Sequence, residues 1–143
     1  MDSSVRCVFI GQGCLFEEIK DLVSSKKLND VILFLGTKNN VHEWLSAMDI
    51  FIRPSLYEGL PVSLIEVQSN GLPAIVSDTI TDNVKLQKNM YYKSLSDGAT
   101  EWAKEILSII DSKSREYCNN CVSAGGFDRT YVVSGLSAGL VCS

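Results

Sequence analysis

The fold is decided by residues 50–77, which read IFIRPSLYEGLPVSLIEVQSNGLPAIVS. The stretch opens with an apolar run, Ile50–Ile52, and Pro54 ends this run because proline cannot continue a central strand. Pro61 then stands where helix starts favour proline, and a second apolar run follows at Ala74–Ser77. Two buried strands joined by a helical segment are typical of a unit with parallel strands.

The same alternation extends outward on both sides of this stretch. Further strands are expected at Val5–Ile10, Val31–Leu35 and Met90–Lys93, and further helices at Leu15–Val23, Val41–Met48 and Asp97–Asp111. Strands that alternate with crossover helices predict an α/β fold, here a Rossmann-like doubly wound parallel sheet. The pattern stops near Ser114, so residues 1–114 are expected to form one domain. Residues 115–143 are left as a tail without assigned structure, although it contains a β-branched patch at Thr130–Val133.

Composition narrows the class of protein. The chain has 143 residues, 45% of them hydrophobic and 21% charged, which is typical of one globular domain. Its net charge is −4 and it has no run of Lys or Arg, so nucleic acid is not an expected partner. The sequence shows neither a signal peptide nor a membrane span, and the expected location is the cytoplasm.

Five cysteines at irregular spacing do not form the paired framework of a secreted mini-domain, and reduced thiols are expected. Cys118 and Cys121 have the spacing of a redox or zinc pair, but the sequence has no second such pair and its one histidine, His42, is remote. We therefore expect no metal site.

The turn after Ile50–Ile52 carries the most informative polar residues. Glu58 precedes the expected helix start and Glu66 lies inside the helix, with seven residues between them. A helix N-terminus suits a phosphate or diphosphate, and Gly59 would let the backbone approach it closely. Helical side chains lean toward the N-terminus, and carboxylates accept hydrogen bonds from neighbouring hydroxyls. The arrangement suits a sugar–diphosphate–ribose ligand, although spacing alone leaves open that both glutamates are ordinary surface charges.

The ordered series of residues resembles glycosyltransferase family 4. Its Glu-x7-Glu signature is matched by Pro54–Glu66 and continued by Gly71–Asp78. The strand and glycine turn of that family resemble Val8–Gly13, and its next strand and helix resemble Val31–Gly36 and Val41–Asp49. The resemblance extends from about Val5 to Ile110.

The resemblance implies a GT-B architecture, in which the carboxyl-terminal domain binds a nucleoside diphosphate sugar and the amino-terminal domain binds the acceptor. This chain would be the donor-binding domain of a retaining enzyme that needs neither a metal nor another cofactor. Glu58 is implied as the catalytic residue that contacts donor-sugar hydroxyls, and Glu66 as a ribose contact. The other implied donor contacts are the backbone N–H groups of Gly59 and Leu60 and a base site at Thr37 and Lys38.

Some residues depart from the family pattern. Gln12 and Cys14 replace the usual Asp and Pro of the glycine turn, and Arg53 stands where an apolar residue is usual. Arg53 is either an uncompensated charge or a neighbour of the phosphates. The phosphate-binding Arg and Lys of the family would precede Met1, as would its first strand and the acceptor-binding domain. We therefore expect no sugar transfer by this chain alone. The complete enzyme would act at the inner face of the membrane, in surface polysaccharide or lipopolysaccharide synthesis.

Two other classes of protein fit the sequence less well. A non-catalytic α/β binding or signalling module would use Asp78, which follows an expected strand, as a phosphoacceptor, but Gly11–Gly13 stands where its paired acidic residues are needed. A sugar-nucleotide epimerase of related fold is disfavoured by residues 54–61.

Overall fold

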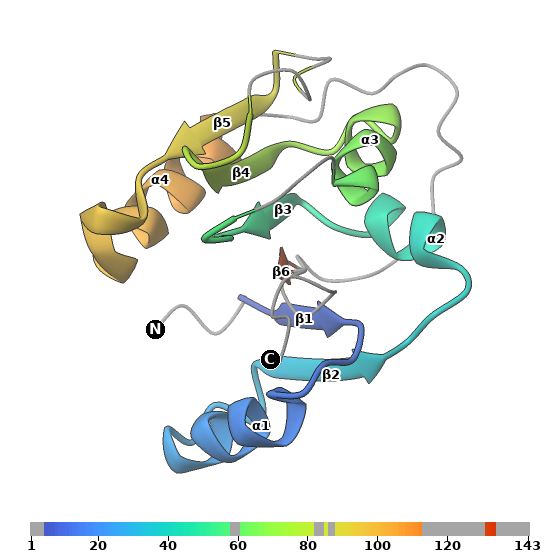
Figure 1. The fold of residues 1–143 in the computed structure, drawn as a ribbon, viewed down its shortest axis with the longest axis vertical. Helices are drawn as coiled ribbons and strands as arrows, with labels where there is room; N and C mark the ends of the chain where they lie inside the picture. Colours follow the sequence, from blue (N-terminus) through green and yellow to red (C-terminus); the bar gives the residue numbers. More distant parts are fainter. Residues whose placement is uncertain (1–4, 58–60, 82–84, 86–87, 113–130, 134–143) are drawn as a thin grey trace.

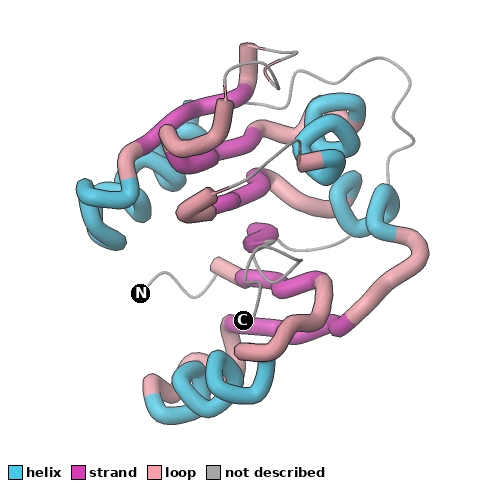
Figure 2. Tube along the Cα trace, in the orientation of Figure 1, coloured by secondary structure: helices cyan, strands magenta, loops and turns pink. Residues whose placement is uncertain are grey.

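The computed structural model describes residues 5–57, 61–81, 85, 88–112 and 131–133, which form a six-stranded sheet with helices packed on it (Figure 1). The strands are β1 (Cys7–Ile10), β2 (Ile32–Gly36), β3 (Ile50–Arg53), β4 (Ala74–Ser77), β5 (Met90–Lys93) and β6 (Tyr131–Val133). The helices are α1 (Phe16–Ser25), α2 (Val41–Ser46), α3 (Val62–Ser69) and α4 (Gly98–Ser112), and a 3-10 turn at Leu95–Asp97 precedes α4. Helices and strands alternate along the chain from β1 to β4 (Figure 2).

The strand order is β2-β1-β6-β3-β4-β5, and every pair is parallel. From β1 the chain moves outward to β2, and from β3 it moves outward in the opposite direction to β4 and β5. This reversal makes the sheet doubly wound and confirms the predicted fold class. The predicted pairing of the two strands of residues 50–77 is also confirmed, since Ile52 lies opposite Ile75 in parallel register.

Helices cover the β3–β5 part of the sheet on both faces. One core cluster joins Phe51 and Val76 of the sheet to Leu45 of α2 and to Leu64 and Val67 of α3. A second cluster joins the residues of β3 and β4 that point the other way to α4; its fully or almost fully buried members are Ile50, Ile52, Ile75, Trp102 and Ile109. The period-2 alternation of a strand explains why neighbours in β3 enter different clusters.

The helix α1 packs on the same face as α4. Val8 of β1 belongs to the cluster of α2 and α3, so its neighbour Phe9 points to the opposite face. There the ring of Phe9 stacks on Phe34 of β2 with centroids 5.1 Å apart, and Phe16 of α1 meets Phe34 edge-on at 5.5 Å. Connections that run in opposite directions along a parallel sheet place their helices on opposite faces, because such crossovers are right-handed.

The strand β6 occupies the middle of the sheet, between β1 and β3 (Figure 1). Val132 lies opposite Val8 on one side and opposite Phe51 on the other. The sequence showed a β-branched patch here, but three residues are too few to display a strand period. Cys118 and Cys121 of the same tail lie outside the described residues.

The element boundaries differ from the predictions by a few residues. The chain turns into β4 through a Schellman motif after α3, in which Gly71 has φ 70° and the N–H of Leu72 donates to the carbonyl of Val67 at 3.2 Å. Pro61 is the residue before α3 rather than its first residue, because its ψ of 100° is extended. Asp97 lies in the 3-10 turn, where its carboxylate pairs with Lys93 Nζ at 3.2 Å.

Candidate functional site

The crevice of a doubly wound sheet lies at the carboxyl ends of the strands, where the winding direction reverses. In this sheet the reversal falls between β1 and β3. The turn Gly11–Gly13 follows β1, and the loop that starts at Pro54 follows β3. Both therefore open at the same edge of the sheet, as do Thr37 and Lys38 after β2.

The helix α3 presents Glu66 to solvent. Leu64 and Val67 are fully buried against the sheet and fix which side of the helix faces inward. Val62, which is 63% exposed, and Glu66 are four residues apart and so lie on the same outward face. Because helical side chains lean toward the N-terminus, the Glu66 side chain is expected to lean toward the end of α3 that follows β3.

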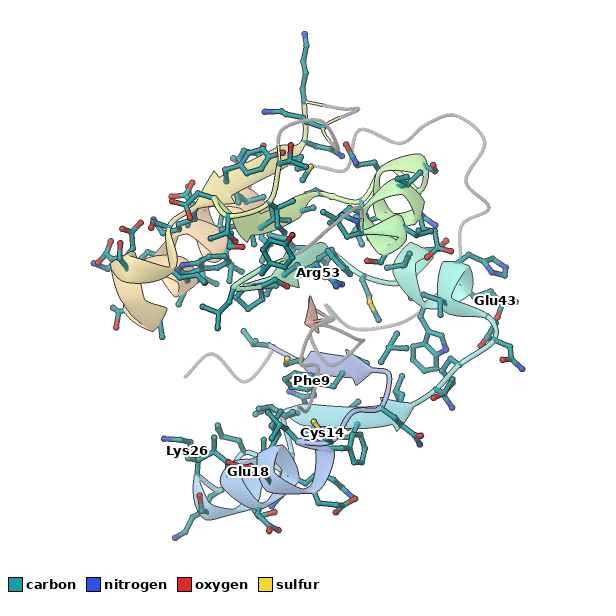
Figure 3. All side chains as sticks on the ribbon, viewed as in Figure 1. Phe9, Cys14, Glu18, Lys26, Glu43 and Arg53 are labelled. Carbon is teal, nitrogen blue, oxygen red and sulfur yellow. The ribbon has the colours of Figure 1, made fainter. Side chains whose placement is uncertain are left out.

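Arg53 links the end of β3 to the first turn of α3. Its side chain is only 4% exposed, and Nη1 donates a hydrogen bond to Ser63 Oγ at 3.1 Å. Figure 3 shows Arg53 in the interior, whereas Glu18 and Lys26 project from α1 at the periphery. The guanidinium group thus has a hydrogen-bond partner in the first turn of α3.

The turn after β2 is tied to the turn after β1. The N–H of Gly11 donates to the carbonyl of Gly36 at 2.9 Å, and Gly36 has φ 65°, which favours glycine. Thr37 is exposed and Lys38 is partly buried directly after this link. Because β1 and β6 lie between β2 and β3, three strand spacings of about 4.8 Å separate the ends of β2 and β3, or about 14 Å.

Glu58, Gly59 and Leu60 lie outside the described residues, so their predicted positions are not tested. The described residues on either side of them carry exposed apolar side chains. Leu56 is 82% exposed, Tyr57 is 81% exposed, and Val62 follows at the start of α3. Large apolar side chains gathered at one loop commonly mark a surface that a ligand or another protein surface covers.

The described part of the chain has neither a cluster of metal-ligating side chains nor a membrane-spanning helix. Within it, no three His, Cys, Asp or Glu side chains gather as metal ligands. None of its helices combines the length and apolar character needed to cross a membrane.

Sequence reasoning missed the hydrogen bond between Arg53 and Ser63. A charged residue at the end of a strand that is otherwise apolar was the available signal, since a buried guanidinium group needs a partner. It also missed the hydrogen bonds that the hydroxyls of Ser77 and Thr79 donate to the backbone carbonyl of Ser55. No sequence motif marks a backbone carbonyl as an acceptor.

The fold and the crevice define a Rossmann-like domain of the kind that forms the carboxyl-terminal half of GT-B glycosyltransferases. The chain belongs to the family described as glycosyl transferases group 1, whose sequence pattern matches residues 1–125. This membership favours the transferase interpretation over a signalling module.

Individual relatives agree with the family. EpsF of Bacillus subtilis (strain 168), whose name gives it as a candidate glycosyltransferase, is 37% identical over 132 residues, which are 90% of this chain and 34% of that protein. The UDP-Gal:alpha-D-GlcNAc-diphosphoundecaprenol alpha-1,3-galactosyltransferase of Escherichia coli is 40% identical over 76% of this chain and 27% of its own length. The Vi polysaccharide biosynthesis protein VipC/TviE of Salmonella typhi is 40% identical over 50% of this chain and 12% of its own length. The chain thus spans about a third or less of the length of these relatives.

Proposed function

We propose that this chain binds the nucleoside diphosphate sugar of a retaining family 4 glycosyltransferase that moves a sugar onto a glycan or a lipid-linked acceptor. The observation that carries the proposal is the placement of α3. This helix follows a strand that flanks the reversal of the sheet, and it presents Glu66 on its open face. A helix N-terminus at such a crevice attracts a diphosphate.

Each part of the donor has a proposed set of contacts. Glu66 accepts hydrogen bonds from the ribose, and the backbone N–H groups of Gly59 and Leu60 bind the diphosphate. Thr37 and Lys38 line the base site. The distance of about 14 Å between the ends of β2 and β3 suits an extended ligand with base, diphosphate and sugar, whereas one sugar or phosphate alone would leave one end of the crevice empty.

Glu58 is the proposed catalytic residue, and it acts by holding the hydroxyls of the transferred sugar. When the bond between the sugar and the diphosphate breaks, negative charge grows on the diphosphate. In this proposal the N–H groups and the positive end of the α3 dipole face that charge, so they would stabilise the transition state more than the ground state. No metal or other cofactor takes part in this proposal.

The proposed acceptor belongs to surface polysaccharide or lipopolysaccharide synthesis. The names of the relatives support this, since one is a galactosyltransferase acting on a diphosphoundecaprenol-linked sugar and another is a Vi polysaccharide biosynthesis protein. A second, acceptor-binding domain would orient the acceptor, and orientation provides much of the rate of such a reaction. We therefore propose that this chain alone transfers no sugar and that the complete enzyme works in the cytoplasm at the inner face of the membrane.

The experiment is calorimetry on two glutamate variants after a panel of UDP, GDP and ADP sugars has identified the best ligand. Glu66→Ala should weaken both the nucleoside diphosphate and its sugar by about 1–3 kcal/mol, because a charged hydrogen-bond partner is lost. Glu58→Ala should weaken only the nucleotide sugar, since the bare diphosphate lacks the hydroxyls that Glu58 contacts.

Glu105→Ala, an exposed glutamate on α4, is the matched control and should change neither affinity. Equal losses of affinity in all three variants, or no loss in any of them, would show that Glu58 and Glu66 are ordinary surface charges. Circular dichroism of each variant checks the fold.

A further inference from the structure

The loop after β3 is anchored to the turn after β4 through one carbonyl oxygen. The backbone carbonyl of Ser55 accepts a hydrogen bond from Thr79 Oγ1 at 2.8 Å and another from Ser77 Oγ. The two hydroxyl oxygens are 2.7 Å apart. Each hydroxyl carries one proton and a carbonyl oxygen has two lone pairs, so the Ser55 oxygen can accept from both at once. We call these three residues the hydroxyl clamp.

The two hydroxyls reach the carbonyl from different environments. Ser77 is fully buried at the end of an apolar strand, where its hydroxyl needs a protein partner. Thr79 is exposed, and water is available to it. Its hydroxyl nevertheless lies against Ser55. Burial therefore explains why the Ser77 hydroxyl bonds to the protein, but it does not explain why the exposed Thr79 hydroxyl does so.

The clamp holds the backbone just before the exposed part of the loop. Ser55 is followed by Leu56 and Tyr57, both more than 80% exposed, and lies three residues before Glu58. The opposite end of the loop is held by the hydrogen bond from Arg53 to Ser63. A backbone that is held at Ser55 and followed by solvated apolar side chains is preorganised for contact with a ligand, since less freedom remains to be lost on binding.

We propose that Ser77 and Thr79 are positioning residues that fix the Ser55 carbonyl and, through it, the backbone that leads to Glu58. This inference rests on the proposed function, in which Glu58 contacts the donor sugar. Loss of a clamp hydroxyl should therefore weaken the nucleotide sugar more than the bare nucleoside diphosphate, because both ligands meet the proposed N–H groups after Glu58 but the sugar alone meets Glu58.

The experiment compares Thr79→Val, which removes the hydroxyl and keeps the shape, with Thr79→Ser, which keeps the hydroxyl. Thr100→Val, an exposed threonine of α4, is the matched control, and Ser77→Ala tests the buried half. The first readout is NMR without ligand: the carbonyl carbon shift of Ser55 and the backbone order parameters of Leu56 and Tyr57. The second is calorimetry with the nucleotide sugar chosen from the UDP, GDP and ADP panel and with its diphosphate.

Thr79→Val should shift the Ser55 carbonyl signal, lower the order parameters and weaken the nucleotide sugar about fivefold, the equivalent of one neutral hydrogen bond. Thr79→Ser should restore all three, and Thr100→Val should match the wild type. Unchanged NMR readouts in Thr79→Val and Ser77→Ala would overturn the clamp. A mobile loop with unchanged affinity would overturn the positioning role while the proposed function stands. Failure of the wild type to bind any nucleotide sugar would overturn the proposed function, and the donor-positioning role with it.

Discussion

The two parts of the sheet on either side of β6 differ in how deeply they are buried. Every residue of β3 and β4 is buried, whereas β1 has one buried residue, Val8, and β2 has none. Helices cover both faces of the β3–β5 part. On β1 and β2, α1 packs on one face through Phe16, and Val8, Ile10 and Leu35 join the cluster of α2 and α3 on the other face. The two sides of the reversal therefore differ in burial. We call β3 and β4, which lead to α3, the firm wall of the proposed crevice, and β1 and β2, after which Thr37 and Lys38 follow, the other wall.

This difference in burial bears on how the proposed donor would be held. The sugar and diphosphate would meet the firm wall, where small displacements matter for the reaction. The base would meet the other wall, which depends more on backbone pairing and on the rings of Phe9, Phe16 and Phe34. The following predictions test whether the two walls differ in stability as their burial indicates.

The largest difference is expected between two phenylalanines. Phe51→Ala should lower the free energy of unfolding by about 3–5 kcal/mol, because Phe51 is 1% exposed and the cavity has little room to collapse. Phe9→Ala should lower it by about 1–2 kcal/mol, because Phe9 is only partly buried and loses mainly its stacking on Phe34. Urea unfolding followed by circular dichroism measures both. Equal losses would remove the contrast between the walls.

The next prediction concerns the link between the two parts. Val132→Pro removes an N–H from the central strand and leaves a neighbouring carbonyl unpaired, which should lower stability by about 1–3 kcal/mol. Hydrogen exchange should then show β1 and β2 opening before β3, β4 and β5. Val132→Ala keeps the N–H and should keep the two parts opening together. Uniform opening in the proline variant would mean that β6 does not couple them.

The smallest contrast is expected between two asparagines. Asn70 joins α3 to α2, since its Nδ2 donates to the carbonyl of His42 at 3.2 Å and to Ser46 Oγ at 3.1 Å. Asn70→Ala should therefore lower the free energy of unfolding by about 1 kcal/mol. Asn29 accepts from Ser24 Oγ on an exposed surface of the other part, and Asn29→Ala should change stability by less than about 0.5 kcal/mol. Thermal unfolding measures both variants, and Asn70→Ala should give the larger decrease in Tm.

The sequence was sufficient to predict five of the strands and the parallel pairing of Ile50–Ile52 with Ala74–Ser77. These strands are apolar runs, and most are separated by clear helical segments. Met90–Lys93 was predicted with its observed bounds. The strand Tyr131–Val133 was not predicted, because its pairing partners are remote in sequence and three residues show no period. The observed ends of α1, α2 and α4 differ from the predicted ends by one to a few residues, since local capping and 3-10 turns determine where a helix ends.

The site was predictable only in outline. The sequence placed Glu66 inside the helix, but it did not show which side of α3 is exposed, because Val62 on the same face as Glu66 is also apolar. The predicted roles of Thr37, Lys38 and Glu66 remain predictions, as do those of Glu58, Gly59 and Leu60. The hydroxyl clamp could not be predicted, because it depends on the three-dimensional approach of two loops rather than on a pattern along the chain.

The place of β6 has a consequence for biosynthesis. It is the last of the six strands in sequence, yet it pairs with Cys7 of β1 and Ile50 of β3 and so bridges nearly the whole chain. During translation the five other strands emerge from the ribosome before the strand that joins them. Until Tyr131–Val133 is made, the inner edges of β1 and β3 present unpaired backbone groups, and such edges recruit other strands. Contacts this distant in sequence also close slowly, so the nascent chain would depend on protection of these two edges during its synthesis.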